Sequence, residues 1–382
     1  MIKKANKFIL LYHTAAKDDI AKRPKAAKMF CGGKMNLHFQ QKREHLQAIL
    51  PRDVHFDERT LTFLHRIDNI DLRNSASGRT ARVRTISDAN AEVHTGGPKM
   101  TNAEKLTLAK HACHIRMGVI EGTHSAKCGH PGGSLDIAEV LAYLYFVEMK
   151  VDPKDPKNPD RDRLVLSKGH AAPALYAALA ERGFFPVEDL KTLRKIGSYL
   201  QGHPNMNSVP GVDMSTGSLG QGVSAACGMA LGAKHAGKPV NVYTILGDGE
   251  VEEGECWEAF MFASHYGLSN LCVMLDRNHL QIDGTTETVM NSAPLEEKLK
   301  AFNFNVLTIN GHDLDAIESA IAAFRAENEK PTCIILDTLK GKGVSFMENS
   351  VDWHGKGPND EEYAQAMQEL NAAYAALEEE DK

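Results

Sequence analysis

The chain has 382 residues, of which 42% are hydrophobic and 25% are charged, and its formal net charge is −6. This is enough for one large or two modest domains. No apolar run approaches the length of a membrane span and no signal peptide is convincing, so we expect a cytoplasmic protein. The seven cysteines form no Cys-x-x-Cys pair, which favours buried free thiols over disulfides or a metal cage.

Residues 1–99 differ in charge from the rest of the chain. They carry 19 Lys and Arg against 10 Asp and Glu, whereas residues 100–382 carry 25 against 40. A basic arm for nucleic acid or a membrane surface is one interpretation, but the basic residues are scattered and few aromatics lie among them. Gly96-Gly-Pro-Lys-Met100 could instead be encoded by a ribosome-binding site ahead of a start codon. We therefore expect a disordered or non-native extension, a domain over 100–382, and neither nucleic acid nor membrane as partner.

The first part of residues 100–382 alternates predicted helices with glycine-rich loops and one short strand. Thr101 or Asn102 can cap the first helix, and Ser134 can open the second. The residues 164–166 form a buried strand, and Ser167-Lys-Gly-His170 follows its carboxyl end. The predicted helices cover residues 101–121, 135–147, 171–182, 187–193 and 223–236.

The central stretch predicts a strand–helix–strand unit. Residues 242–246 are apolar and end in Gly247-Asp248-Gly249, a helical pattern covers 252–266, and residues 271–275 are a second buried strand with Asn278 just beyond it. A right-handed crossover puts Asp248 and Asn278 at the same edge of a parallel sheet, where open α/β sheets bind ligands. Later strands at 305–309 and 332–337, and helices at 313–325 and 361–380, complete a doubly wound, mostly parallel α/β fold flanked by helices.

The carboxylate of Asp248 and the amide oxygen of Asn278 suit a hard cation. Mg²⁺ takes six oxygens and completes its shell with water and ligand phosphates, and a backbone carbonyl near Leu280 could add one more. Gly247 and Gly249 would let backbone N–H groups approach a phosphate closely. The residues therefore indicate a Mg²⁺–diphosphate clamp; the ordinary alternative is a Gly-Asp-Gly turn with Asn278 as a cap.

Four of the seventeen histidines lie in turns flanked by glycine or proline, and these are His130, His170, His203 and His354. Histidine can hold a hydroxyl or move a proton because its pKa is near neutrality. A single histidine of this kind is more often solvated or capping. Four at predicted loop ends of one α/β layer favour a catalytic site.

Five signatures in order resemble transketolase, specifically its amino-terminal, diphosphate-binding half. The resemblance runs from about Thr101 to about Pro358, and Gly247-Asp248-Gly249 followed by Asn278 resembles the thiamine-diphosphate motif. The signatures are Cys128-Gly-His-Pro-Gly132, Ser167-Lys-Gly-His170, Gly202-His-Pro204, Thr216-Gly-Ser-Leu-Gly-Gln-Gly222 and Asp352-Trp-His-Gly355. Cys128 stands where many relatives have serine and Ser218 where many have proline, which affects packing more than chemistry.

The resemblance implies a cofactor, thiamine diphosphate, and a metal, Mg²⁺, for which Ca²⁺ or Mn²⁺ can substitute. Asp248, Asn278 and the Leu280 carbonyl would hold the metal. His170 and His354 would reach the diphosphate and the reacting centre, His130 would bind and protonate substrate, and His203 would bond a donor hydroxyl. Around the cofactor, Gly247 and Gly249 would face the diphosphate, Gly217 and Leu219 would line the aminopyrimidine, and Glu253 would lie at the subunit contact, unless it is an ordinary exposed helix residue.

The resemblance also implies that part of the active site is supplied by another chain. Transketolases continue into a second domain, with the glutamate that activates the aminopyrimidine, and a third domain; neither is in this sequence. We expect the amino-terminal subunit of a two-chain transketolase, acting on sugar phosphates with a carboxy-terminal, pyrimidine-binding subunit, with two copies of each chain. The alternatives are transfer to or from an unusual or sulfonated sugar, the alpha subunit of a 2-oxo-acid dehydrogenase, and a non-catalytic scaffold paralogue.

Overall fold

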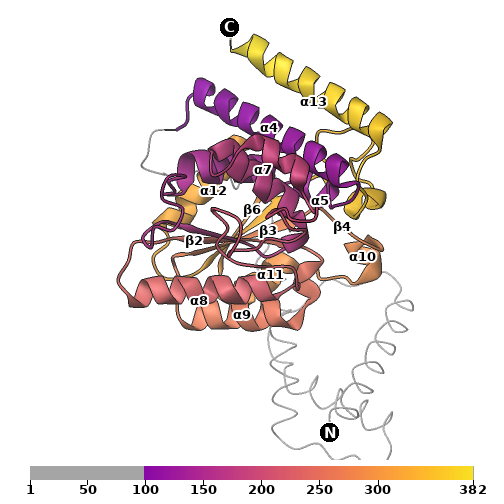
Figure 1. Cartoon of the computed structure of the whole chain (residues 1–382). Helices are drawn as coiled ribbons and strands as arrows, with labels where there is room; N and C mark the ends of the chain where they lie inside the picture. The colour runs from indigo at the N-terminus through magenta and orange to yellow at the C-terminus, as the bar shows by residue number, and fades with distance from the viewer. Residues whose placement is uncertain (1–98, 382) are drawn as a thin grey trace, which may run out of the picture. The chain divides into compact units, whose positions relative to one another are not determined.

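The computed structural model describes residues 99–381, so the predicted extension over 1–99 lies almost wholly outside the described residues. Five parallel strands form the central sheet in the order β1-β2-β3-β7-β6 (Figure 1). Their bounds are β1 Arg163–Leu166, β2 Val242–Gly247, β3 Leu271–Arg277, β6 Asn305–Asn310 and β7 Thr332–Asp337. The predicted parallel sheet is confirmed, and β3 runs two residues further than the apolar pattern indicates.

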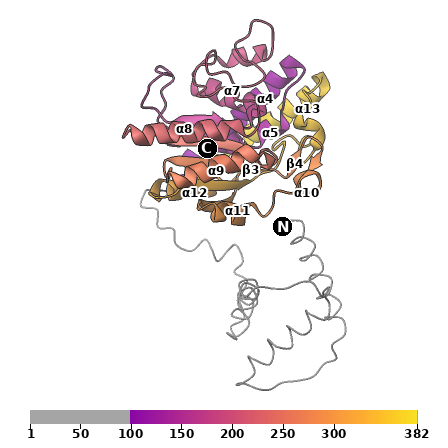
Figure 2. The same cartoon turned by 90° about the horizontal axis from the view of Figure 1, so that it is seen from below.

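Helices cover both faces of the sheet (Figures 1 and 2). Their apolar side chains fall into two buried clusters, one on each face. The first face carries α4 (Asn102–Ala126), α6 (Ala138–Tyr143), α7 (Ala172–Arg182) and α12 (Leu314–Ala326), with α13 (Asp360–Glu380) packed on α4. The second face carries α8 (Gln221–His235), α9 (Gly254–His265) and α11 (Leu295–Ala301). The fold is therefore the expected doubly wound α/β arrangement.

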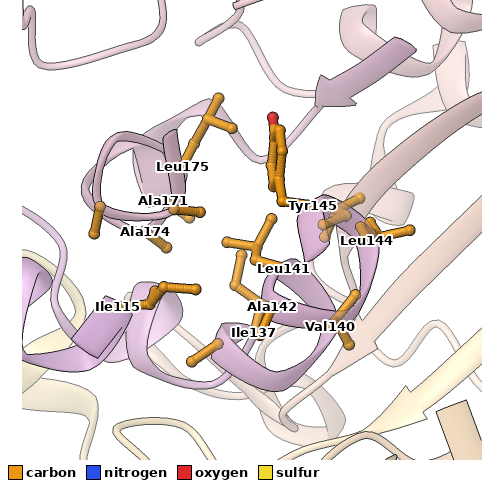
Figure 3. Close-up of a cluster of buried hydrophobic side chains, with 14 of the residues drawn as sticks. Ile115, Ile137, Val140, Leu141, Ala142, Leu144, Tyr145, Ala171, Ala174 and Leu175 are labelled. Atoms are coloured by element: carbon orange, nitrogen blue, oxygen red, sulfur yellow. The ribbon is translucent and has the colours of Figure 1, made fainter. Parts of the chain in front are cut away.

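The larger core lies beneath α4, α6 and α7 (Figure 3). Ile115, Leu141 and Leu175 come from these three helices and are at most 2% exposed. The alanines of α7 are also buried, which lets neighbouring backbones approach closely. This packing fixes the direction of α7 and of the His170 turn ahead of it.

Short elements fill the loops at the carboxyl edge. They are α5 Gly132–Leu135, the π-helical turn η2 Leu144–Glu148, the 3₁₀ turns η3 Gly169–Ala171, η4 Val187–Thr192, η5 Glu250–Glu252 and η6 Val351–His354, the helix α10 Thr286–Val289, and an antiparallel ribbon of β4 Leu280–Gln281 and β5 Gly284–Thr285. Among residues 99–381, no helix has the length and apolar character needed to cross a membrane.

Three predicted helices differ from the structure. The helix expected over 135–147 is divided into α5, α6 and η2, because Ile137 leaves helical geometry at φ −107° and ψ 14°. Residues 187–192 form a 3₁₀ turn rather than an α-helix. The helix expected from 252 starts at Gly254, because Glu253 is extended at ψ 130° and separates it from η5. The first helix instead runs five residues further than predicted, and ends where Lys127 adopts φ +52°.

Candidate active site

Asp248 lies directly after β2, and its carboxylate joins two loops at the carboxyl edge. Oδ1 accepts a hydrogen bond from the N–H of Gly249 at 2.9 Å, and Oδ2 accepts one from the N–H of His279 at 2.7 Å. The second bond brings the loop after β3, with Asn278 and Leu280, against the aspartate. The sequence-based expectation that these residues meet at one edge of neighbouring strands is confirmed.

The side chain of Asn278 is held through its nitrogen. Nδ2 donates to Asp136 Oδ2 at 2.9 Å and to Asp276 Oδ2 at 3.0 Å. Oδ1 accepts one hydrogen bond, from the N–H of Leu280 at 3.1 Å, and an amide oxygen has two lone pairs. The carbonyl of Leu280 accepts from Lys340 Nζ at 3.0 Å. The three oxygens are the hard donors that Mg²⁺ requires.

The electrostatics at Asp248 also fit a cation. Burial of the side chain and the nearby charge of Asp276 raise the pKa of Asp248 to about 7, although two backbone N–H groups oppose the shift. A divalent ion beside the carboxylate would favour its charged form. The residues present therefore fit the implied metal.

Two buried lysines supply positive charge that the sequence-based prediction missed. Lys168 Nζ lies 2.5 Å from Asp276 Oδ2 and 3.2 Å from Asp136 Oδ1, and it donates to the Gly133 carbonyl at 2.7 Å. Lys340 Nζ lies 2.9 Å from His354 Nδ1. Both lysines are at most 2% exposed. Lysine is rarely buried, so only their places beside His170 and in the glycine-rich loop before His354 could have indicated them.

The structure brings the four predicted histidines into one cluster. The ring centroid of His130 lies 5.3 Å from that of His170, 5.7 Å from that of His354 and 6.4 Å from that of His203. His170 and His354 are stacked at 5.1 Å. The rings come from four loops that are separate in sequence, so this convergence is a property of the fold.

All four histidines favour the neutral form at neutral pH. Burial, followed by nearby positive charges such as those of Arg194 and Lys340, lowers the pKa of His130 to about 4 and that of His354 to about 3. The pKa of His170 is lowered well below its usual value, and that of His203 is also lowered, with burial as the first cause in both. A neutral imidazole can accept a proton or a hydroxyl hydrogen bond.

His130 has a buried ring nitrogen that lacks a partner. Within residues 99–381, no hydrogen bond reaches its Nδ1. A buried polar atom of this kind costs free energy unless a ligand or water satisfies it. The cluster therefore fits a polar ligand.

The loop before α8 forms a small cavity beside the cluster. Gly217 has φ +151°, and a Cβ there would lie 3.1 Å from the His203 ring, so only glycine fits. Thr216 fixes the loop by donating to the carbonyl of Leu166 at 2.7 Å. The cavity measures about 80 Å³ and is lined by residues 214–218, Gln221 and Gly222. Leu219 lies outside the lining and is 37% exposed.

Glu250 organises this region, and the sequence-based prediction missed it as well. Its buried carboxylate accepts hydrogen bonds from Ser167 Oγ at 2.5 Å, from the N–H of Gly220 at 3.0 Å and from the N–H of Gly247 at 3.1 Å. Glu253, the glutamate that the sequence indicates instead, is an exposed residue at the start of α9. Because the N–H groups of Gly247 and Gly249 bond to acidic side chains, their contact with a diphosphate stays a prediction.

Comparison with known proteins identifies the family. The family described as "Transketolase, thiamine diphosphate binding domain" matches residues 108–377. The 6-deoxy-6-sulfo-D-fructose transketolase subunit SqwG of Clostridium sp. (strain MSTE9) is 48% identical over 70% of this chain and 97% of its own length. One of the two subunits of the apulose-4-phosphate transketolase of Phocaeicola vulgatus is 42% identical over 72% of this chain and 98% of its own length.

Longer transketolases match over less than half of their length. Human transketolase is 42% identical over 66% of this chain and 40% of its own. A solved transketolase from Pichia stipitis superposes with a TM-score of 0.66 at 32% identity, and covers 72% of this chain and 44% of the solved one. The chain thus spans less than half of these proteins and nearly all of the two subunits. It belongs to the transketolase family, through the thiamine-diphosphate-binding domain that residues 108–377 form.

Proposed function

We propose that the chain is the amino-terminal subunit of a two-chain transketolase. With thiamine diphosphate and Mg²⁺, the complex would transfer a two-carbon ketol unit from a ketose phosphate to an aldose phosphate. The observation that carries the proposal is the cluster of four neutral histidines beside the oxygen ligands at the carboxyl edge of the sheet. A scaffold paralogue has no need of this arrangement.

Three oxygens would hold the metal, from Asp248, Asn278 and the Leu280 carbonyl. The hydrogen bonds that Asn278 donates to Asp136 and Asp276 support this role, because they fix which end of the amide is turned to the ion. Bound thiamine diphosphate supplies the carbanion chemistry that breaks and remakes the carbon–carbon bond. The chain's part is to hold its diphosphate through the metal, with Ca²⁺ or Mn²⁺ as possible replacements.

The histidines would bind and orient the sugar and move protons. His130 has an unpartnered buried Nδ1 and lies between the other three rings, which suits a group that contacts the substrate carbonyl or hydroxyls. His203, at the outer side of the cluster, would bond a donor hydroxyl. His170 and His354 would lie nearer the diphosphate, where Lys340 adds positive charge. Gly217 and Leu219 would line the aminopyrimidine, and Glu253 would lie at a subunit contact.

A second chain would complete the site. The two relatives that this chain covers almost fully are named as subunits, and the chain covers only 40% of human transketolase. The partner would be a carboxy-terminal transketolase subunit with the pyrimidine-binding half and most of the sugar-phosphate contacts. A complex of two copies of each chain follows from the prevalence of closed twofold assemblies.

The test is ketol transfer by the chain alone, by a candidate partner alone, and by the two together. We expect turnover only from the mixture, and tighter cofactor binding in the complex because the binding energies are linked. The variant His130→Asn should bind cofactor in the complex and lose turnover. Robust turnover by the purified chain, with mass spectrometry showing no partner, would contradict the two-chain proposal.

A sulfonated donor is a second candidate. A relative at 48% identity is named a 6-deoxy-6-sulfo-D-fructose transketolase subunit. The two substrates differ in the terminal group, a phosphate or a sulfonate, at the end of the sugar remote from the reacting carbonyl. Comparing kcat/KM of the complex for fructose 6-phosphate and 6-deoxy-6-sulfofructose decides between them. A preference of at least tenfold for either donor would assign the substrate class.

A further inference from the structure

A group of three potential metal ligands lies outside the candidate active site. His111 and His114 stand one turn apart on α4, and Glu181 is next to the last residue of α7. Oε1 of Glu181 lies 2.9 Å from Nδ1 of each histidine. Each residue offers one ligand atom, and the three atoms lie within 4.8 Å of one another. Glu181 is near the end of α7 remote from His170, roughly 14 Å along the helix axis.

The two imidazole rings are held in place by aromatic neighbours. His111 stacks on Phe146 with 3.7 Å between ring centroids and 14° between planes, and His114 stacks on Tyr374 at 4.7 Å and 20°. The side chains are 25% exposed for His111, 38% for His114 and 20% for Glu181. The group is thus largely ordered by packing, while remaining open to an ion from solvent.

We propose that His111, His114 and Glu181 form a site for a borderline divalent cation such as Zn²⁺, Co²⁺ or Ni²⁺. Two imidazoles and a carboxylate are a common ligand set for these ions, whereas Mg²⁺ prefers oxygen alone. Ligand atoms about 2.1 Å from one ion lie roughly 3.0–3.5 Å apart, close to the present spacing. Water would complete the coordination.

The charges around the site leave the carboxylate available. Oε2 of Glu181 accepts no hydrogen bond from any residue within 99–381. The adjacent Arg182 is directed elsewhere, because its Nε donates to the Tyr145 carbonyl and its guanidinium lies over Phe146. Lys110 is paired with Asp381. Glu181 can therefore bind an ion through one oxygen or through both.

Binding would fasten α4 to α7. These two packed helices position the candidate active site, since the loop after α4 carries His130 and the turn before α7 carries His170. An ion that joins them in the folded state alone stabilises that state by mass action. The role is structural, and it does not depend on the proposed function.

The test is metal binding to the full chain, freed of metal and kept in excess Mg²⁺ to occupy oxygen sites. The variants are Glu181→Gln, which keeps a hydrogen-bond acceptor, and His111→Gln with His114→Gln. The matched control is His235→Gln, an exposed histidine at the end of α8. Zn²⁺ affinity is measured by calorimetry, Co²⁺ coordination by visible absorption, and folding by circular dichroism. Histidines and Cys31 in residues 1–98 contribute equally to all four proteins.

We expect wild type and His235→Gln to bind one equivalent of Zn²⁺ that raises their melting temperatures. In the ligand variants this equivalent should weaken at least tenfold and the rise should disappear. If Zn²⁺ titrations and melting shifts are the same in all four proteins, or if wild type binds no Zn²⁺, the histidine–glutamate contacts serve only to join the helices and the proposal is wrong. Should the double variant fail to fold, Glu181→Gln alone decides.

Discussion

At the scale of single residues, the candidate site is supported by charges buried directly beneath it. Asp136 and Asp276 share Lys168 between them and hold the amide of Asn278. Burial and the charge of Asp276 raise the pKa of Asp136 to about 6. Burial lowers the pKa of Lys168, but the two aspartates outweigh it and the net shift is upward. Each charge is tolerated because its partners are present.

We expect Lys168→Met to destabilise the protein by about 3–5 kcal/mol, because it leaves two buried carboxylates without their cation. The measurement is urea unfolding followed by circular dichroism. The matched control is Lys238→Met, whose half-exposed ammonium pairs with an exposed Asp160, and which should cost at most about 1 kcal/mol. Equal losses in the two variants would show that the buried network contributes nothing special.

Asp248→Ala should abolish Mg²⁺-dependent binding of thiamine diphosphate and leave the sheet folded. Asp248 would supply the charge that the metal sees directly, since the other two proposed ligands are neutral oxygens. The measurement is calorimetry on the reconstituted complex, with Asp155→Ala in an exposed connector as the control. Unchanged cofactor affinity in Asp248→Ala would remove the aspartate from the metal site.

At the scale of the elements, a second buried network ties α4 to α6 and to the loop before α12. Glu139 on α6 accepts from Arg116 Nη2 at 2.7 Å and lies 3.1 Å from His312 Nδ1. Burial would raise the pKa of Glu139, but the Arg116 charge and the contact with His312 outweigh it and lower the pKa to about 2. The helix pair is therefore joined most strongly when this carboxylate is charged.

This network predicts a pH dependence. Because the folded-state pKa of Glu139 lies below its ordinary value of 4.5, its contribution to stability is present above pH 4.5 and is lost as pH falls towards 2. Wild type should exceed Glu139→Gln in unfolding free energy by about 3 kcal/mol at pH 7. The difference should shrink as urea unfolding is repeated at lower pH. A difference that stays constant from pH 7 to pH 3 would contradict this account.

At the scale of the whole molecule, the described domain has its own beginning. The N–H of Met100 donates to Glu318 Oε1 on α12 at 2.9 Å, and Thr101 and Glu104 form a capping box on α4. These contacts satisfy the first turn of α4 within the domain itself. The core contains no described residue before Met100.

We therefore propose that residues 100–382 fold as a unit, and expect a chain beginning at Met100 to keep the activity and melting temperature of the full chain. A new amino terminus at Met100 would still lie beside Glu318. Calorimetric melting of the two chains is the measurement. A stabilising contribution of ~1 kcal/mol from residues 1–99 would appear as a drop of roughly 2 °C or more on truncation.

Much of the fold could be predicted from the sequence, because short apolar runs followed by glycine mark buried parallel strands. The strands β2, β3, β6 and β7 begin where the apolar pattern begins. Helix ends were predicted less well. Whether the helix after Asp248 starts at 252 or 254 depends on Glu250, whose carboxylate bonds to residues far away in sequence.

The sequence by itself determined the α/β class, the meeting of Asp248 and Asn278 at one sheet edge, and the four histidines, since strand ends and glycine-flanked turns are local features. Only the tertiary structure decided that the four rings lie within 6.4 Å of His130, that Lys168 and Lys340 are buried, and that Glu250 rather than Glu253 orders the loops. The physical reason is that the burial and pKa of a charged side chain depend on partners from distant segments, and no local pattern records them.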